Sequence, residues 1–245
     1  MSSELRKYIN SNAKFCRKCI MNNIVDKWIS FNDDGICNHC IRYNQLFSSR
    51  VASPDVSDDQ LNNIVQAIKR NGRKSEYDCI IGVSGGVDST YVALLVKKYG
   101  LRPLAVHVDN GWNSELAVKN IELTLKNNDI DLYTEVLNWP EFRDLQKSFL
   151  YSSTPHGEIP SDHAINATLW READRRNIKY IISGMNFSSE SIQSNYWSYG
   201  HADWIYIKDI HEKFGNIPLK SFPHFTPLYL FYLTFIRRIK NISIL

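Results

Sequence analysis

The sequence predicts an α/β protein in which a parallel β-sheet carries helices on both faces. Short apolar runs alternate along the chain with segments of helical periodicity, and this alternation is typical of parallel strands joined by crossover helices. Several apolar runs end in a polar or glycine-containing loop, as parallel strands do at the edge where ligands bind. The 245 residues are 43% hydrophobic and 22% charged, which suits one substantial globular domain with a small addition.

Four buried strands and five covering helices are expected from these patterns. The strands are predicted at Tyr77–Val83, Pro103–Val108, Leu132–Leu137 and Tyr180–Ser183. The helices are predicted at Ser57–Gly72, Asp88–Tyr99, Ser114–Asn127, Pro140–Leu150 and Ser161–Asn177. Because right-handed crossovers place the loops after the strands along one carboxyl edge, the loops starting at Ser84, Asp109 and Gly184 should converge.

Composition divides the chain into four parts. These are a cysteine-containing module at 1–50, a linker and amphipathic helix at 51–76, the main domain at 77–220 and an apolar segment at 221–245, with the polar stretch Phe47–Ser57 read as the linker. The last part is rich in Phe, Tyr and Leu, but its unbroken stretch Leu228–Ile236 is about half as long as a membrane-spanning helix requires. A core helix is therefore favoured over a membrane-surface helix. We expect this end either to be cut short at Leu245 or to dock on a partner.

Charge and the first residues argue against several functional classes. A net charge of +3 gives no indication of a nucleic-acid partner. The stretch Met1–Lys14 is polar and of mixed charge, unlike a signal peptide. We therefore expect a cytoplasmic protein without stable membrane insertion, and the sequence leaves homo-oligomer formation open.

Four of the five cysteines have the spacing of a metal site. Cys16, Cys19, Cys37 and Cys40 form two C-x2-C pairs separated by 17 residues, the spacing of a zinc ribbon or knuckle. Structural zinc is favoured, an iron–sulfur cluster is the alternative, and disulfides are disfavoured without a secretion signal. His39 could replace one thiolate.

The fifth cysteine lies inside the first predicted strand. Cys79 is expected to be a small buried hydrophobe, and a nucleophile is the minority interpretation.

The stretch at residues 84–90 has the composition of an anion cradle. It joins an apolar strand ending at Val83 to an amphipathic helix, so the helix N-terminus adds unpaired N–H donors and a positive dipole end. Neither a Walker lysine nor a third glycine of a dinucleotide fingerprint is present. Asp88 could cap the helix or hold Mg²⁺. The other candidate anion-binding residues are Ser84, Gly85, Gly86, Ser89 and Thr90. The alternative interpretation is a strand–helix turn without a ligand.

Two further loops supply candidate residues at the same edge. Asp109 follows the second strand and suits a ribose hydroxyl or a substrate donor, although an Asx turn explains it equally well. Trp112 could stack on a substrate ring or simply pack. Gly184 after the fourth strand would let the chain pass close to a nucleotide, and Asn186 and Glu190 would face the reacting centre, with turn chemistry as the alternative.

The segment between these loops adds one candidate. Asp162 is taken as a substrate-binding residue because it lies in a glycine- and proline-containing stretch. The neighbouring His156 and His163 are interpreted as structural.

The Ser84–Thr90 stretch resembles the PP-loop of ATP pyrophosphatases, whose pattern is Ser-Gly-Gly-x-Asp-Ser. The resemblance implies the adenine nucleotide alpha hydrolase-like fold and the splitting of ATP into AMP and pyrophosphate. With the cysteine pairs before it and the motifs Asp109–Asn113, Gly184–Ser191 and Ile210–Gly215 after it, the chain is similar to the N-acetyl sugar amidotransferases of bacterial surface-polysaccharide synthesis, the WbpG and PseA type. That resemblance covers roughly Lys14 to Lys240, and Val87 stands where those enzymes commonly have Lys.

This resemblance implies a reaction and its participants. ATP would adenylate the amide oxygen of an acetamido, nucleotide-linked sugar, and ammonia from a separate glutaminase subunit would displace AMP to leave an acetamidino group. Mg²⁺ would accompany ATP, and zinc would be structural. The implied catalytic residues are Ser84, Asp88, Asn186 and Glu190; the implied nucleotide-binding residues are Val83, Ser84, Gly85, Gly86, Asp88, Ser89, Thr90, Asp109 and Gly184.

Two alternatives stay open at this stage. A PP-loop enzyme of tRNA thiolation fits the cysteine module, although such enzymes usually need more cysteines in the catalytic domain than Cys79 alone. A non-catalytic protein that binds zinc, ATP or a glutaminase also fits. Turnover that requires both ammonia and an acetamido sugar would separate these classes.

Overall fold

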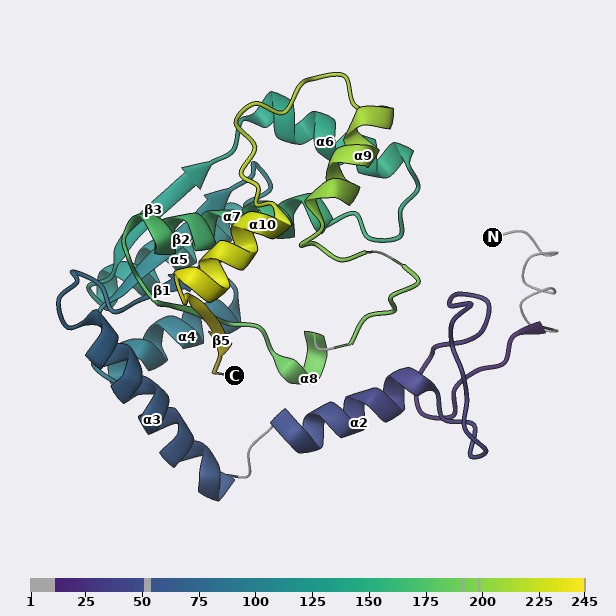
Figure 1. Ribbon diagram of the computed structural model, residues 1–245, viewed down its shortest axis with the longest axis horizontal. Helices are drawn as coiled ribbons and strands as arrows, with labels where there is room; N and C mark the ends of the chain where they lie inside the picture. The colour runs from purple at the N-terminus through teal and green to yellow at the C-terminus, as the bar shows by residue number, and fades with distance from the viewer. Residues whose placement is uncertain (1–11, 51–53, 191, 198, 245) are drawn as a thin grey trace.

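A computed structural model describes residues 12–50, 54–190, 192–197 and 199–244 as an α/β fold around one parallel sheet (Figure 1). The sheet has the strand order β3-β2-β1-β4-β5, and each neighbouring pair is parallel. The strands are β1 (Cys79–Gly82), β2 (Pro103–Asp109), β3 (Asp131–Val136), β4 (Tyr180–Ser183) and β5 (Lys240–Ser243). The predicted fold class is thus confirmed, with the four expected strands and a fifth that the sequence did not indicate.

The strand order creates a switch point between β1 and β4. From β1 the chain moves outward through β2 to β3, and it then crosses to the other side of β1 to form β4 and later β5. At such a point the connections leave in opposite directions, which opens a crevice at the carboxyl ends of the two strands. The loops that begin at Ser84 and Gly184 follow these two strands, so both border the crevice.

Alternate side chains of the strands pack against two helical layers. Cys79 and Ile81 of β1 belong to a core shared with helices α3, α4 and α5, whereas Ile80 belongs to a core shared with α7 and the C-terminal segment. Such alternation is what two-sided burial of a strand requires. Cys79 is fully buried and burial raises its pKa, which agrees with the prediction of a small core residue.

The helices match the predicted ones and add several that were not predicted. Their bounds are α2 (Asn38–Arg50), α3 (Pro54–Gly72), α4 (Val87–Lys98), α5 (Glu115–Asn127), α6 (Trp139–Tyr151), α7 (Ile159–Arg175), α8 (Phe187–Glu190), α9 (Trp204–Phe214) and α10 (Pro227–Phe231). Helices α2, α8 and α9 were not predicted, and α10 forms part of the C-terminal stretch where a core helix was expected. The expected linker Phe47–Ser57 is helical at both ends, since α2 continues to Arg50 and α3 begins at Pro54.

The C-terminal segment differs from the single core helix that was expected. After α10 come the π-helical turn η1 (Tyr232–Ile236) and β5, which adds to the edge of the sheet beside β4. Leu233 and Ile239 are buried in the core, while Leu228 and Phe235 are exposed. Among the helices of the described residues, none combines the length and apolarity needed to cross a bilayer.

Candidate functional site

The turn from β1 into α4, residues 84–90, is held in shape by its own hydroxyl groups, and we call it the Ser84 loop. The hydroxyl of Ser89 accepts a hydrogen bond from the Ser84 N–H at 3.2 Å and donates to the Gly86 carbonyl at 3.2 Å. Gly86 is the N-cap of α4, and the first helical bond runs from the Thr90 N–H to its carbonyl at 3.1 Å. The N–H groups of Val87, Asp88 and Ser89 precede that bond and lack helical partners. The turn therefore offers an anion site at a helix N-terminus.

Asp88 lies in the first turn of α4, half-buried, but does not cap the helix. Its carboxylate makes no hydrogen bond or ion pair with any residue that the structure describes, and the N-cap Gly86 has no side chain. Of the two roles predicted for Asp88, capping is therefore wrong. Its oxygens stay available for a hard cation beside a bound phosphate, which is the kind of ligand that Mg²⁺ prefers.

A close approach of α5 fixes the conformation of Gly85. Gly85 has a φ of +77°, and a Cβ on it would lie 2.3 Å from the carbonyl oxygen of Ala117. The Asn120 side-chain amide donates to the Gly85 carbonyl at 3.1 Å, which ties the Ser84 loop to α5. Asn120 was not among the predicted site residues.

Gly85→Ala should destabilise the protein by about 2–4 kcal/mol, because it adds both steric overlap and left-handed backbone strain. Urea unfolding measures this loss. Gly200→Ala is a matched control: Gly200 also has a positive φ of 89°, but its Cβ position has no atom of a described residue within 4 Å apart from its chain neighbours. This control should lose only the strain contribution. Equal losses in the two variants would contradict the close approach of α5.

A buried histidine that the sequence analysis missed links the first two loops. The Nδ1 of His107 lies 2.9 Å from the Val83 carbonyl oxygen, and its Nε2 lies 3.2 Å from the Asn113 amide nitrogen. Since a carbonyl can only accept, Nδ1 donates and Nε2 accepts from Asn113. The sequence could have suggested His107, because a polar histidine inside the otherwise apolar strand Pro103–Asp109 is unusual and needs a partner.

The loop after β2 begins with an Asx turn. The Asp109 carboxylate accepts from the Gly111 N–H at 3.0 Å and from the Asn113 amide at 3.1 Å through the same oxygen. Its second oxygen makes no hydrogen bond with any residue that the structure describes, so the predicted ribose contact stays a prediction. Trp112 is 65% exposed and meets Trp139 edge-on, with ring centroids 5.8 Å apart. One part of Trp112 therefore packs, and the rest is accessible.

The loop after β4 passes against the helix N-terminus. A Cβ on Gly184 would lie 3.3 Å from the Ser89 nitrogen, so glycine allows close contact with the backbone of α4. The Asn186 side chain accepts from the Ser188 N–H at 2.9 Å, and Glu190 accepts from the Asn186 N–H at 3.1 Å. The three predicted loops thus converge, while Asn186 and Glu190 also serve the short helix α8.

Asp162 lies in the first turn of α7, which reaches the same edge of the sheet. Burial raises the pKa of its carboxyl. The preceding Ser161 hydroxyl accepts from Asn110 of the β2 loop at 3.4 Å and from Gln146 at 3.3 Å. The structure therefore joins the start of α7, where Asp162 lies, to the second loop.

His163 is a core residue, as the sequence analysis expected. Its Nδ1 donates to the His201 carbonyl at 2.6 Å, and its Nε2 accepts from the Phe225 N–H at 3.4 Å. Burial lowers its pKa to about 4, so the ring is neutral at pH 7.

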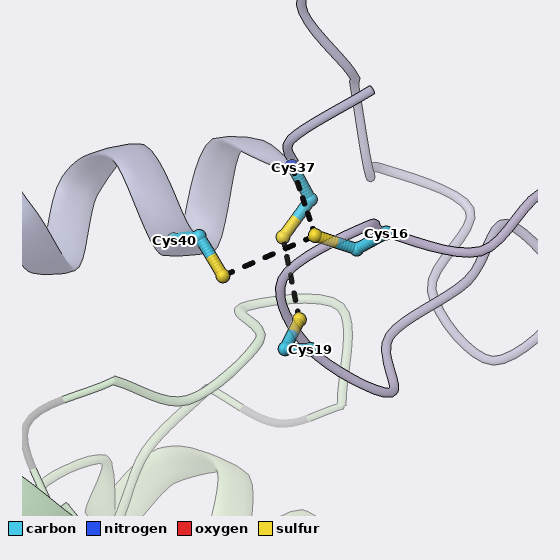
Figure 2. Close-up of side chains that lie close together, drawn as sticks. All are labelled: Cys16, Cys19, Cys37 and Cys40. Carbon is cyan, nitrogen blue, oxygen red and sulfur yellow. Dashed lines mark hydrogen bonds between the residues drawn. The ribbon is translucent and has the colours of Figure 1, made fainter. Parts of the chain in front are cut away.

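The four paired cysteines gather in one place, as predicted, at the start of α2 and in the turns before it (Figure 2). Their sulfurs all lie within 4.8 Å of one another. The Cys19–Cys37 pair is 3.7 Å apart and the Cys16–Cys40 pair is 4.0 Å apart. A tetrahedral ion with bonds of about 2.3 Å requires sulfurs about 3.8 Å apart, so this donor set fits zinc.

Hydrogen bonding around the sulfurs also fits a bound cation. Burial opposes ionisation of Cys16, but N–H groups of Cys37 and Lys18, both 3.3 Å from its sulfur, lower its pKa to about 6. Burial and the neighbouring thiols raise the pKa of Cys40. The His39 ring lies 2.6 Å from the Asp26 carboxylate, so it does not replace one of the four thiolates. Cys40 therefore resists ionisation until a cation joins the cluster.

The fold and the site together define an α/β protein with a Ser-Gly-Gly-x-Asp-Ser turn at the switch point of a parallel sheet, preceded by a Cys₄ cluster that could hold a metal. No protein-family model matches the chain. The chain is 29% identical over 176 residues to an uncharacterized protein of Methanocaldococcus jannaschii, an alignment that covers 69% of this chain and 58% of that relative.

A shorter stretch is similar to an enzyme. Over 76 residues the chain is 42% identical to the glutamine-hydrolyzing GMP synthase of Pyrobaculum aerophilum, which covers 31% of this chain and 15% of that enzyme. The chain thus spans less than two thirds of the length of either curated relative.

Solved structures with a partly similar fold include two synthetases. The NH3-dependent NAD synthetase of Campylobacter jejuni aligns with a TM-score of 0.43 at 14% identity, over 66% of this chain and 73% of that one. The NMN synthetase of Francisella tularensis aligns with a TM-score of 0.43 at 19% identity, over 77% of this chain and 72% of that one.

Proposed function

We propose that this protein splits ATP into AMP and pyrophosphate to activate an amide oxygen, and that its substrate is the acetamido group of a nucleotide-linked sugar. Ammonia from a separate glutaminase would then displace AMP to give an acetamidino group, in the synthesis of a surface polysaccharide such as an O-antigen or a nonulosonic acid. The observation that carries the proposal is the ordered Ser84 loop at the switch point of the sheet. The Cys₄ cluster before it and the motifs after it support the amidotransferase within that class.

Displacement of the amide oxygen by ammonia requires a good leaving group. An amide oxygen leaves poorly as hydroxide, whereas adenylation makes it part of AMP. The N–H groups at the start of α4 are oriented to bind phosphate oxygens, and the dipole of that helix favours the negative charge that develops on pyrophosphate. Asp88 has carboxylate oxygens free of described partners and would hold Mg²⁺, which neutralises phosphate charge when bound.

The remaining edge residues would bind the rest of the two substrates. The free Asp109 oxygen suits a ribose hydroxyl, and the exposed face of Trp112 suits a ring. Asp162 in the first turn of α7 and Glu190 in α8 carry carboxylates that suit sugar hydroxyls. The similarity of one stretch to a glutamine-hydrolyzing synthase supports glutamine as the source of nitrogen.

Release of pyrophosphate tests this proposal. Purified protein is given ATP and Mg²⁺ with ammonium and a UDP-linked acetamido sugar, and each component is omitted in turn. We expect release only when both ammonium and the sugar are present. Release with tRNA and a sulfur donor in their place would instead favour a thiolation enzyme, and no release under any condition would favour a non-catalytic role.

Val87→Lys should tighten the binding of ATP several-fold, because Val87 is 85% exposed at the first position of α4 and a lysine there adds a cation beside the phosphates. The effect should weaken at high salt. The measurement is the KM for ATP at low and high ionic strength. Leu94→Lys, on an exposed part of the same helix, should leave the KM unchanged. A matching effect in both variants would argue against phosphates at this helix start.

A further inference from the structure

The segment between β4 and α9, residues 184–203, is bound at two separate places, and we call it the linking loop. At its start, Gly184 lies against the backbone of Asp88 and Ser89 in the Ser84 loop. Further along, its residues contact the cysteine module, which we define as residues 12–50. Figure 1 shows α8 of this loop beside α2, away from the sheet. The linking loop is therefore a direct connection between the candidate nucleotide site and the cysteine module.

The central contact is a buried carboxylate shared by both parts. Asp26 is fully buried, and one of its oxygens accepts from the Ser194 hydroxyl at 2.6 Å and lies 2.6 Å from His39. The other oxygen accepts from the Trp28 N–H at 2.8 Å. Burial opposes ionisation of Asp26, but these hydrogen bonds outweigh it and lower its pKa. Since His39 lies between two of the four cysteines, Asp26 joins Ser194 to the metal-binding turns.

Three further contacts join the linking loop to the cysteine module. The Trp197 indole N–H donates to the Val25 carbonyl at 2.8 Å. The rings of Tyr196 and Trp28 meet edge-on, with their centroids 5.5 Å apart. Near the start of the linking loop, the ring of Phe187 stacks on that of Tyr43 of α2, with the ring centroids 5.8 Å apart. The module thus contacts the loop both before and after residue 191, through polar and aromatic groups.

We propose that the cysteine module is a positioning element for the linking loop. Asp26, folded into place with the cysteines, fixes Ser194 and its neighbours, and this keeps Gly184, Asn186 and Glu190 at the edge of the Ser84 loop. Loss of the metal would then release the loop and weaken the candidate nucleotide site. The positioning role of the module stands on geometry alone, whereas its effect on the candidate nucleotide site rests on the proposed use of ATP.

Hydrogen exchange read by mass spectrometry tests the positioning. The variant Ser194→Ala with Trp197→Phe removes the two loop donors without touching a cysteine. It should keep its metal, measured by elemental analysis, while amides at 187–197 exchange roughly tenfold faster. Chelation of the wild-type metal should raise exchange in the same residues. Ser48→Ala is the control, since its hydroxyl donates only to the Asn44 carbonyl within α2, and it should exchange like wild type.

Calorimetry with ATP and Mg²⁺ tests the effect of the linking loop on the candidate nucleotide site. The double variant should bind ATP roughly fivefold to tenfold more weakly than wild type, and Ser48→Ala should bind it equally well. Unchanged exchange at 187–197 in the double variant would overturn the positioning role. Faster exchange with unchanged affinity would overturn the link to the nucleotide site. Absence of ATP binding in wild type would overturn the proposed function and that link together, while the exchange data still decide the positioning role.

Discussion

Asp88→Ala should abolish pyrophosphate release while leaving the fold intact. The carboxylate makes no hydrogen bond or ion pair with a described residue, so its removal breaks no contact that the structure shows. The loss of a negative charge from the first turn of α4 costs only about 0.3–1 kcal/mol of stability. Removal of a group that stabilises charge in a transition state lowers turnover by about 10²–10³. The measurement pairs the rate of pyrophosphate release with the thermal midpoint.

Two further variants separate charge from shape. Asp88→Asn keeps the shape and removes the charge, so it should lose as much activity as Asp88→Ala. Glu115→Ala removes an exposed acid from the first turn of α5 and calibrates the stability change expected from the helix dipole alone. Wild-type rates in either Asp88 variant would refute the role assigned to this residue.

The centre of the sheet could be predicted because β1, β2 and β4 are buried on both faces, whereas β3 is largely exposed. Strands such as Pro103–Asp109 are almost continuously apolar, and glycine or polar residues follow them directly. β5 escaped prediction because it lies at the sheet edge and reads Lys-Asn-Ile-Ser, in which only Ile242 is apolar. α2 escaped because its sequence is polar on most faces and its burial comes from packing beside the linking loop.

The site was predicted in outline for a similar reason. Parallel strands bring their following loops to one edge, so the meeting of the Ser84, Asp109 and Gly184 loops follows from topology. His107 and Asn120 were missed because their roles depend on where a neighbouring carbonyl points. The contact of Asp26 with Ser194 spans 168 residues, and no local pattern in the sequence indicates it.

Cys37→Ser should remove the metal and unfold the cysteine module while the sheet persists. Cys37 is fully buried at the start of α2, and its sulfur lies 3.7 Å from that of Cys19. The three hydrophobic core clusters contain no residue before Leu61, so apolar packing among the described residues gives the module little support of its own. Metal binding to such a cluster contributes about 10–16 kcal/mol to folding at neutral pH. The measurements are elemental analysis and hydrogen exchange, and residues 12–50 should lose protection while β1, β2 and β4 keep theirs.

Cys79→Ala provides the matched control for the effect of losing a thiol. Cys79 is equally buried but lies in β1, where its pKa is raised by burial and it packs among apolar side chains. This variant should keep one metal ion per chain and full protection of residues 12–50, while global stability falls by about 1 kcal/mol. If metal-free Cys37→Ser protein kept a protected module, hydrogen bonds such as those of Asp26 would suffice to fold it, and the Cys₄ cluster would have another role.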